Sequence, residues 1–178
     1  MSTTSKKPII IAIDLGSSRT HCIAIDHRGK VVGQAALDTQ TINPESLAPL
    51  GKEYDADQLW SSIITVVKTV LRKCNTETGP VIAVAATSQR QGMVLLDAVG
   101  KELHIGPNTD LRAFMEGQVI DHEHGSEVYR TTGHTPSFLF TPAKLRWFQE
   151  HRPEIFGNVQ TVLSIDAWIT YKLSGELA

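Results

Sequence analysis

A carboxylate, a glycine and two hydroxyl side chains occur within five residues near the start of the chain, as Asp14, Gly16, Ser17 and Ser18. They follow an apolar run at residues 9–13. Glycine allows a backbone to approach a ligand closely, and successive N–H groups in such a turn bind anions. Asp14 would repel a phosphate but can hold Mg²⁺, directly or through water. The motif predicts a loop that cradles a terminal phosphate and its metal ion.

The same residues also fit a plain β-hairpin in which Asp14 caps the turn and Gly16 supplies a positive φ. No Gly-Lys-Ser/Thr follows, so the motif is not a Walker loop. On this motif alone, both interpretations stay open.

A second group of polar residues, Asp121-His122-Glu123-His124, invites a metal-binding interpretation. Its spacing matches no zinc signature and its neighbours are polar, so a solvated helix end is favoured. Farther on, Phe138, Leu139 and Phe140 form an apolar triplet, which would line a binding cleft or cover the core; core packing is favoured.

Composition narrows the class of protein. The 178 residues carry a net charge of −2 and are 41% hydrophobic, which is typical of a globular domain and speaks against a nucleic-acid-binding surface. We find no long apolar run of the kind that spans a membrane. Cys22 and Cys74 make no disulfide framework, so we expect free thiols in the cytoplasm.

The elements that must position these residues follow from periodicity. Runs at residues 9–14, 20–26 and 30–37, separated by tight turns, predict an antiparallel meander. Apolar residues at three- and four-residue spacing after Asp55 predict a helix of about five turns. The continuous apolar run at residues 81–87 predicts a buried parallel strand.

The second half of the chain is predicted with shorter elements. We expect a strand at 93–97, a weak helix at 110–119, a helix capped by Thr141, a strand at 161–163 and a last helix that stops at Gly175. The order β-β-β-α-β with appended helices indicates an α/β fold with a mixed five-stranded sheet.

Five stretches, taken in order, resemble the FGGY family of carbohydrate kinases within the actin-like ATPase superfamily. They are DLGSS at 14–18, ATSQRQG at 86–92, NTDLR at 108–112, TG at 132–133 with KLRW at 144–147, and DAW at 166–168 with LSGE at 173–176. The resemblance extends from Ile9 to Ala178. It implies an α/β domain of the actin-like, ribonuclease-H-like type, with the five-stranded mixed sheet flanked by helices.

The resemblance also implies roles for individual residues. Asp14 matches the family aspartate near the metal and the γ-phosphate of ATP, and residues 16–18 match the hairpin tip over that phosphate. Arg90 and Gln91 match a pair that contacts sugar or polyol hydroxyls, and Asp110 matches a substrate-side aspartate. Asp166 matches a position that is interpreted as a structural helix cap.

Two positions depart from the family pattern. The usual Arg or Lys seven residues after the hairpin aspartate is His21 here, and Arg19 lies two residues earlier, on the same face of the strand. We expect Arg19 to take that role at the phosphate. Many members have a tryptophan where this chain has Asn108, so amide hydrogen bonding would replace stacking on the substrate. Stretches similar to autoinducer-2 kinases and to xylulokinases leave both substrate types open.

FGGY kinases are longer than this chain, so the resemblance implies an N-terminal domain at residues 8–178, after a disordered tail at residues 1–7. The catalytic base is expected beyond Ala178, and the C-terminal domain that holds adenine is absent, so we expect little or no activity from the fragment alone. The expected ligands are ATP, Mg²⁺ and a sugar or polyol, with no nucleic acid or membrane; a homodimer is left open. The alternatives are an actin-like nucleotide switch and a non-catalytic binding module.

Overall fold

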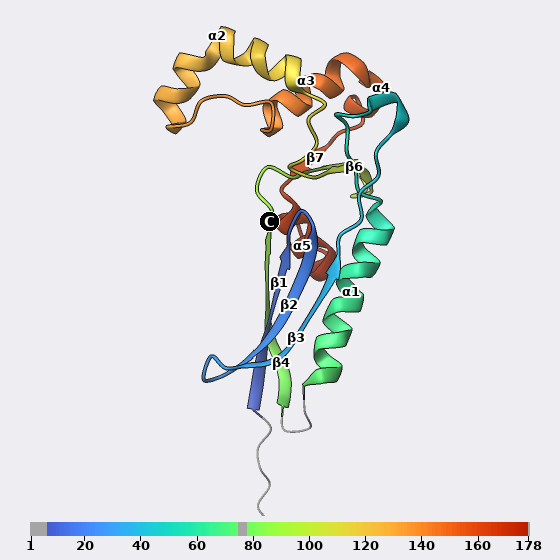
Figure 1. Ribbon diagram of the computed structural model, residues 1–178, viewed down its shortest axis with the longest axis vertical. Coiled ribbons are helices and arrows are strands. Elements are labelled where there is room, and N and C mark those ends of the chain that lie inside the picture. The colour runs from blue at the N-terminus through green and yellow to red at the C-terminus, as the bar shows by residue number, and fades with distance from the viewer. Residues whose placement is uncertain (1–6, 75–77, 178) are drawn as a thin grey trace, which may run out of the picture. The chain divides into compact units, whose positions relative to one another are not determined.

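The computed structural model describes residues 7–74 and 78–177, and the chain divides into two compact units (Figure 1). Unit 1 comprises Met1–Gln40, Ala56–Gln89 and Ile165–Ala178, and unit 2 comprises Thr41–Asp55 and Arg90–Ser164. Because the chain leaves unit 1 twice and returns twice, no single stretch of sequence acts as a linker between the units.

Unit 1 is built on a four-stranded mixed sheet with the order β3-β2-β1-β4. The strands β1 (Lys7–Leu15), β2 (Arg19–Asp26) and β3 (Val31–Asp38) form the predicted antiparallel meander, and β4 (Thr78–Ser88) runs parallel to β1. Lys7 already belongs to β1, so the predicted tail was one residue too long at this end, and residues 1–6 lie outside the described residues.

Two helices cover one face of this sheet. Alternate residues of β1, from Ile9 to Leu15, are buried there against the apolar stripe of α1 (Ala56–Lys73). The helix α5 (Ile165–Ser174) packs on β4 with Trp168 fully buried, and Gly175 ends it at φ 78° as predicted. The sheet's core is therefore one-sided among the described residues.

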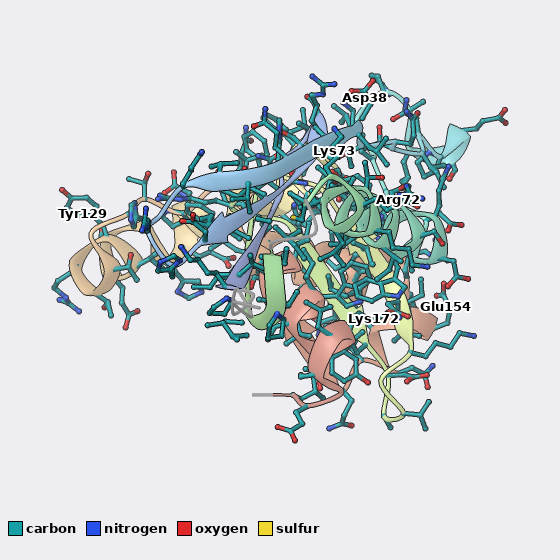
Figure 2. The ribbon with its side chains drawn as sticks, turned by 90° about the horizontal axis from the view of Figure 1, so that it is seen from below. Asp38, Arg72, Lys73, Tyr129, Glu154 and Lys172 are labelled. Carbon is teal, nitrogen blue, oxygen red and sulfur yellow. The ribbon has the colours of Figure 1, made fainter. Side chains whose placement is uncertain are left out.

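The C-terminal end of α1 carries two basic residues, and one of them contacts the meander. Arg72 and Lys73 stand in its last turn, where cations interact favourably with the helix dipole (Figure 2). Lys73 Nζ also donates to the Gln34 carbonyl of β3 at 2.9 Å. Helix and sheet edge are thus joined by a hydrogen bond as well as by packing.

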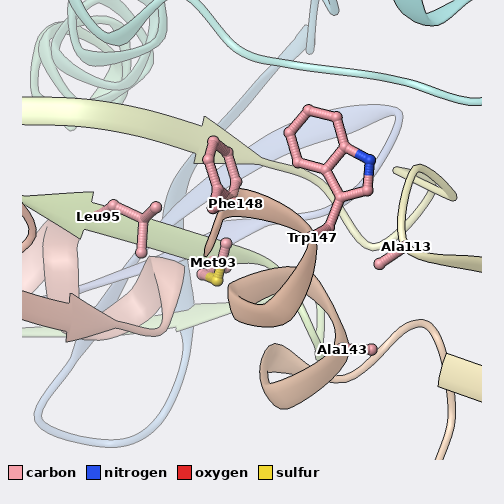
Figure 3. Close-up of a cluster of buried hydrophobic side chains, with 6 residues drawn as sticks. All are labelled: Met93, Leu95, Ala113, Ala143, Trp147 and Phe148. Carbon is pink, nitrogen blue, oxygen red and sulfur yellow. The ribbon is translucent and has the colours of Figure 1, made fainter. Parts of the chain in front are cut away.

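Unit 2 contains a three-stranded antiparallel sheet, β6-β5-β7, and several helices. Its strands are β5 (Met93–Leu96), β6 (Glu102–Gly106) and β7 (Thr161–Leu163), and its helices are η1 (Glu45–Leu47), α2 (Phe114–Thr132), α3 (Thr141–His151) and α4 (Pro153–Phe156). Figure 3 shows its core, in which six buried side chains pack together: Met93, Leu95, Ala113, Ala143, Trp147 and Phe148.

The α/β class with a mixed sheet is confirmed, but the predicted single five-stranded sheet is instead a four-stranded and a three-stranded sheet. After β4 the chain turns at Gln91, whose φ is 65°, and β5 then pairs with β6 and β7. A short strand flanked by antiparallel partners later in the chain carries no signal of the sheet to which it belongs. The strand β6 itself was not predicted.

Two helix boundaries also differ from expectation. The weak helix predicted at 110–119 is the start of a continuous helix of 19 residues, α2, in which the 121–124 run lies mid-helix. The cap of α3 is Phe140, without a side-chain hydrogen bond, and Thr141 is already helical. Pro142 is the second residue of α3, in the first turn, where a missing N–H costs no helical hydrogen bond.

Candidate functional site

The turn between β1 and β2 is closed by its backbone. Gly16 N donates to the Arg19 carbonyl at 2.9 Å, and a Cβ added at Gly16 would lie 2.9 Å from that same oxygen. A side chain at this position would therefore force the turn to open. The tip, with Ser17 and Ser18, leaves a bare backbone of the kind that approaches a phosphate.

Asp14 lies at the open face of the sheet, beside this turn. Its cross-strand partners are His21 on β2 and Thr87 on β4, and directly paired residues of neighbouring strands point to the same face. All three are exposed. A carboxylate, an imidazole and a hydroxyl thus share one accessible surface, and an exposed carboxylate next to a bare turn suits a hydrated divalent cation.

Arg19 begins β2 and forms an ion pair with Asp38 on β3, its cross-strand neighbour, at 3.0 Å from Nε to Oδ1. Both side chains are exposed, at 57% and 71%, and exposed pairs of this kind contribute roughly 0–1 kcal/mol. The guanidinium is therefore held only weakly, and an anionic ligand can compete for it.

The parallel ladder of β1 and β4 continues one residue beyond the strands. Gln89 N donates to the Leu15 carbonyl at 2.8 Å, so Gln89 lies beside the residue that precedes the turn, and Arg90 is the next residue along the chain. Ser88 Oγ donates to Asp166 Oδ1 and accepts from Asp166 N, both at 3.1 Å. Asp166 thereby ties the start of α5 to the end of β4, which supports its structural interpretation.

A buried lysine holds the backbone around two predicted substrate-binding residues in unit 2. Lys144 Nζ on α3 donates to the carbonyls of Gln91 and Pro107, each at 3.1 Å, and Pro107 directly precedes Asn108. Burial lowers the pKa of Lys144 from its ordinary value of 10.5 to about 8, partly offset by Asp110. Sequence reasoning missed this role, although a lysine between Ala143 and Trp147 on an apolar helix face was a usable signal.

Asp110 is fully buried and engaged with protein groups. Both its oxygens accept from Arg112 Nε, at 2.9 and 2.8 Å, and Oδ1 also accepts from Lys52 N. Arg112 continues to Glu53 at 2.8 Å and lies over the Trp147 ring. In this arrangement Asp110 organises the turn that carries Asn108, and its carboxylate does not open to a ligand.

This network also affects a buried histidine. His104 lies 3.7 Å from Glu53, from Nδ1 to Oε1, and tilts against Phe148. Burial, followed by the positive charge of Arg112, holds the pKa of His104 well below its usual range, so the ring is neutral at physiological pH.

A cavity of about 400 Å³ in unit 2 includes Gln91 in its lining. Its walls are mostly apolar, with polar groups from a few side chains; the residues are Gln91, Ile120, Val128, Thr132, His134, Pro136, Ser137, Phe140, Thr141, Pro142 and Ala143. Of the apolar triplet, Phe140 lines this cavity, and all three residues are half-buried. Core packing was the favoured prediction for Phe140, but this residue also lines a cavity.

Cys22 and Cys74 are both free thiols, Cys22 buried and Cys74 half-buried. Burial raises the pKa of Cys22 to about 11, with a contribution from Cys74, so this thiol is unreactive at neutral pH. Within the described part of the chain, every helix is too short or too polar to cross a bilayer.

The chain is similar to known sugar kinases over nearly its whole length. Residues 9–178 match the N-terminal domain of the FGGY family of carbohydrate kinases. The chain is 30% identical over 173 residues to an autoinducer-2 kinase of Enterobacter sp. (strain 638), covering 95% of this chain and 32% of that protein. The chain therefore spans about a third of the length of this relative.

Solved structures agree on the fold. The xylulose kinase of Rhodospirillum rubrum superposes with a TM-score of 0.85 at 27% identity, over 96% of this chain and 35% of that one. A gluconate kinase from Lactobacillus acidophilus superposes with a TM-score of 0.86 at 21% identity, over 96% of this chain and 34% of that one, and shows the fold alone.

Proposed function

Since this chain belongs to the FGGY family of carbohydrate kinases, we propose that it is the N-terminal part of an enzyme that transfers the γ-phosphate of ATP to a hydroxyl of a sugar or polyol. The chain spans about a third of its relatives' length, and the proposal concerns the longer protein. The base that takes the proton from the attacking hydroxyl would lie beyond Ala178, so the fragment alone would have little or no kinase activity.

The observation that carries the proposal is the hydrogen bond from Gln89 N to the Leu15 carbonyl. It aligns the end of β4 with the start of the phosphate-type turn, and Arg90 follows Gln89 directly. In open α/β sheets, ligands bind beyond the carboxyl ends of the parallel strands. A phosphate donor at β1 and an acceptor after β4 fit this rule.

At the donor end, Asp14 would hold Mg²⁺ and the turn formed by Gly16, Ser17 and Ser18 would take the γ-phosphate. The ion would neutralise charge on the phosphate oxygens when bound. The tight approach of Gly16 to the Arg19 carbonyl supports this role, because no side chain obstructs the tip. Arg19 would exchange its weak pairing with Asp38 for the phosphate.

At the acceptor end, Arg90, Gln91 and Asn108 would orient the hydroxyl groups of the substrate by hydrogen bonds. Two hydrogen bonds from Lys144 support this, because they hold the backbone at Gln91 and just before Asn108. Asp110 would contribute by positioning Asn108, since its own oxygens are bonded to Arg112.

The substrate would be a ketopentose such as xylulose, or the linear precursor of autoinducer-2. The relatives support both, since an autoinducer-2 kinase and a xylulose kinase each match nearly the whole chain. Both are small, hydroxyl-rich molecules, as the polar residues of the acceptor end require.

The proposal is tested by titrating the chain separately with MgATP and with a panel of pentuloses, polyols and autoinducer-2 precursor, followed by amide chemical shifts. MgATP is expected to perturb the amide shifts of residues 14–20. The sugar is expected to perturb those of residues 90–92 and 108. Asp14→Asn should weaken MgATP binding at least tenfold without affecting sugar binding. Arg90→Ala should weaken sugar binding at least tenfold without affecting MgATP binding.

Arg28→Ala, in the exposed turn between β2 and β3, serves as the matched control and should change neither affinity. Binding of MgATP with no response to any sugar would favour the nucleotide switch instead. Binding of neither ligand would favour a non-catalytic module, and in either case the roles proposed for residues 14–20, 90–92 and 108 would be abandoned.

A further inference from the structure

Two carboxylates and one imidazole meet where the start of α2 contacts the end of α3. Glu116 stands in the first turn of α2, and Glu150 and His151 end α3. One ligand atom from each lies within 4.8 Å of the others. The ring of His151 donates from Nε2 to Glu116 Oε1 at 3.0 Å.

The carboxylate of Glu116 is the unusual member of this cluster. Its side chain is only 7% exposed, and its second oxygen, Oε2, has no hydrogen-bond partner among the described residues. A buried carboxylate oxygen is normally paired, because burial removes the water that would solvate its charge. The structure thus contains a desolvated negative group directed at a histidine and a second carboxylate.

The histidine ring is also held in a defined orientation. It tilts against the Trp147 ring at 31°, with the centroids 5.2 Å apart, and Trp147 is buried in the core of unit 2. A ring whose orientation is restricted by packing loses less freedom when Nε2 binds a ligand.

From these observations we infer that Glu116, Glu150 and His151 form a site for a zinc-class divalent cation that joins α2 to α3. Two carboxylate oxygens and one imidazole nitrogen suit Zn²⁺, whereas Mg²⁺ prefers oxygen ligands alone. Ligands about 2.1 Å from a tetrahedral zinc lie roughly 3.4 Å apart, so small side-chain rotations would close the site. Zinc binds the lone pair on Nε2 of the neutral imidazole, so the ring takes the tautomer with its proton on Nδ1, the hydrogen bond from Nε2 to Glu116 is lost, and water completes the coordination.

Arg146 is the competitor for this site. Its Nε donates to Glu150 Oε1 at 2.9 Å and its Nη1 to Glu123 at 3.3 Å, both at the surface. A zinc ion must displace Arg146 from Glu150, and exposed ion pairs of this kind are weak. Removal of the guanidinium should therefore strengthen zinc binding. This gain is expected only if Glu150 is one of the zinc ligands.

The test is a titration of the metal-free chain with Zn²⁺, by calorimetry and by thermal unfolding, with Mg²⁺ as the comparison ion. We expect one zinc per chain, a rise in the unfolding temperature and no such rise with Mg²⁺. Glu116→Gln and His151→Ala should each weaken binding at least tenfold. Arg146→Gln should tighten it several-fold. Glu150→Gln, at an exposed position that leaves folding intact, should also weaken it.

The nearby histidines of α2 provide the matched control, because His122 and His124 are exposed and could bind zinc without a built site. The double variant His122→Ala/His124→Ala should bind zinc as the natural chain does. The inference is overturned if this double variant loses binding, if Glu116→Gln and His151→Ala bind normally, or if the natural chain binds no zinc.

Discussion

Lys144 shows what one buried charge does in this protein. Its ammonium group is enclosed in unit 2 and donates to the carbonyls of Gln91 and Pro107, beside the proposed acceptor residues. Because burial lowers its pKa to about 8, the folded chain gives up this proton at a pH at which the unfolded chain retains it. Stability should therefore depend on pH through this side chain.

The sign of that dependence follows from proton linkage. Below pH 8 both states carry the proton, and between pH 8 and pH 10.5 only the unfolded state does, so the free energy of unfolding should rise with pH in this window. We expect the difference in this free energy between the natural chain and Lys144→Met to grow in favour of the natural chain as the pH rises from 8 towards 10.5, in urea unfolding.

Lys101→Met is the control, since Lys101 is exposed in the turn before β6. A constant difference between the natural chain and Lys144→Met across the window would contradict the assignment of this titration to Lys144.

For single residues, the sequence was informative where the role of a residue depends on its neighbours in the chain. A turn lies at Gly16 as the motif indicated, although without a positive φ, and Asp166 lies in the first turn of α5 and not at its cap. Lys144, Arg112 and Glu116 were not predicted to be buried, because each has a hydrogen-bond partner that lies 35 to 60 residues away along the chain. No local pattern encodes such pairings.

Among the elements, α2 depends on a close approach that only glycine allows. A Cβ at Gly117 would lie 2.6 Å from the backbone nitrogen of Phe138 and 2.5 Å from its Cα. The backbone around Phe138 cannot yield as a flexible side chain would. A residue that weakens a helix in isolation is thus required here by packing, which is why sequence reasoning underestimated the length of α2.

Gly117→Ala should lower the free energy of unfolding by roughly 1–3 kcal/mol, the usual cost of an added methyl group in a filled space. Gly125→Ala is the comparison on the same helix, because its Cβ would meet the Asp121 side chain, with Oδ1 at 2.7 Å, and no backbone atom of the described residues outside its own helix lies within 4 Å. That side chain can rotate away, so this variant should be neutral or up to about 1 kcal/mol more stable. Urea unfolding measures both, and equal losses would refute the packing explanation.

In the molecule as a whole, β4 is the least protected strand. Among the described residues it pairs only with β1, and Val81, Ile82 and Val84 are 40%, 63% and 48% exposed. An apolar strand at the edge of a sheet offers unpaired backbone and apolar side chains to a second chain. Purified alone, this chain should therefore self-associate through β4.

Ile82→Lys should shift sedimentation velocity profiles toward the monomer at concentrations where the natural chain associates, because charge at an edge opposes pairing. Its free energy of unfolding should change by no more than about 0.5 kcal/mol, as for other exposed positions. Val99→Lys, in the turn after β5 and 84% exposed, should leave association unchanged. Equal association by the natural chain and Ile82→Lys would exclude β4 as the contact.

For the whole chain, the family resemblance predicted more of the fold than the periodicity did. The α/β class of actin-like type is confirmed by the family match and by the superposed sugar kinases. Periodicity correctly assigned β1 to β4 and α1 as elements, because each has a long apolar pattern, but the burial predicted for β4 was wrong, since Val81, Ile82 and Val84 are exposed at the edge of the sheet. It could not divide the strands between two sheets, since the strand β5 has only four residues, all buried, and no alternation that would identify a partner.

The interleaved course of the chain has a consequence for synthesis on the ribosome. Domains that follow one another in a sequence fold in the order in which they are made. Here the last residue of unit 2 is Ser164, whereas unit 1 still requires α5, at Ile165–Ser174, to cover β4. Synthesis of unit 2 is therefore complete before synthesis of unit 1. The strands β1 to β4 leave the ribosome before α5, the helix that completes their unit.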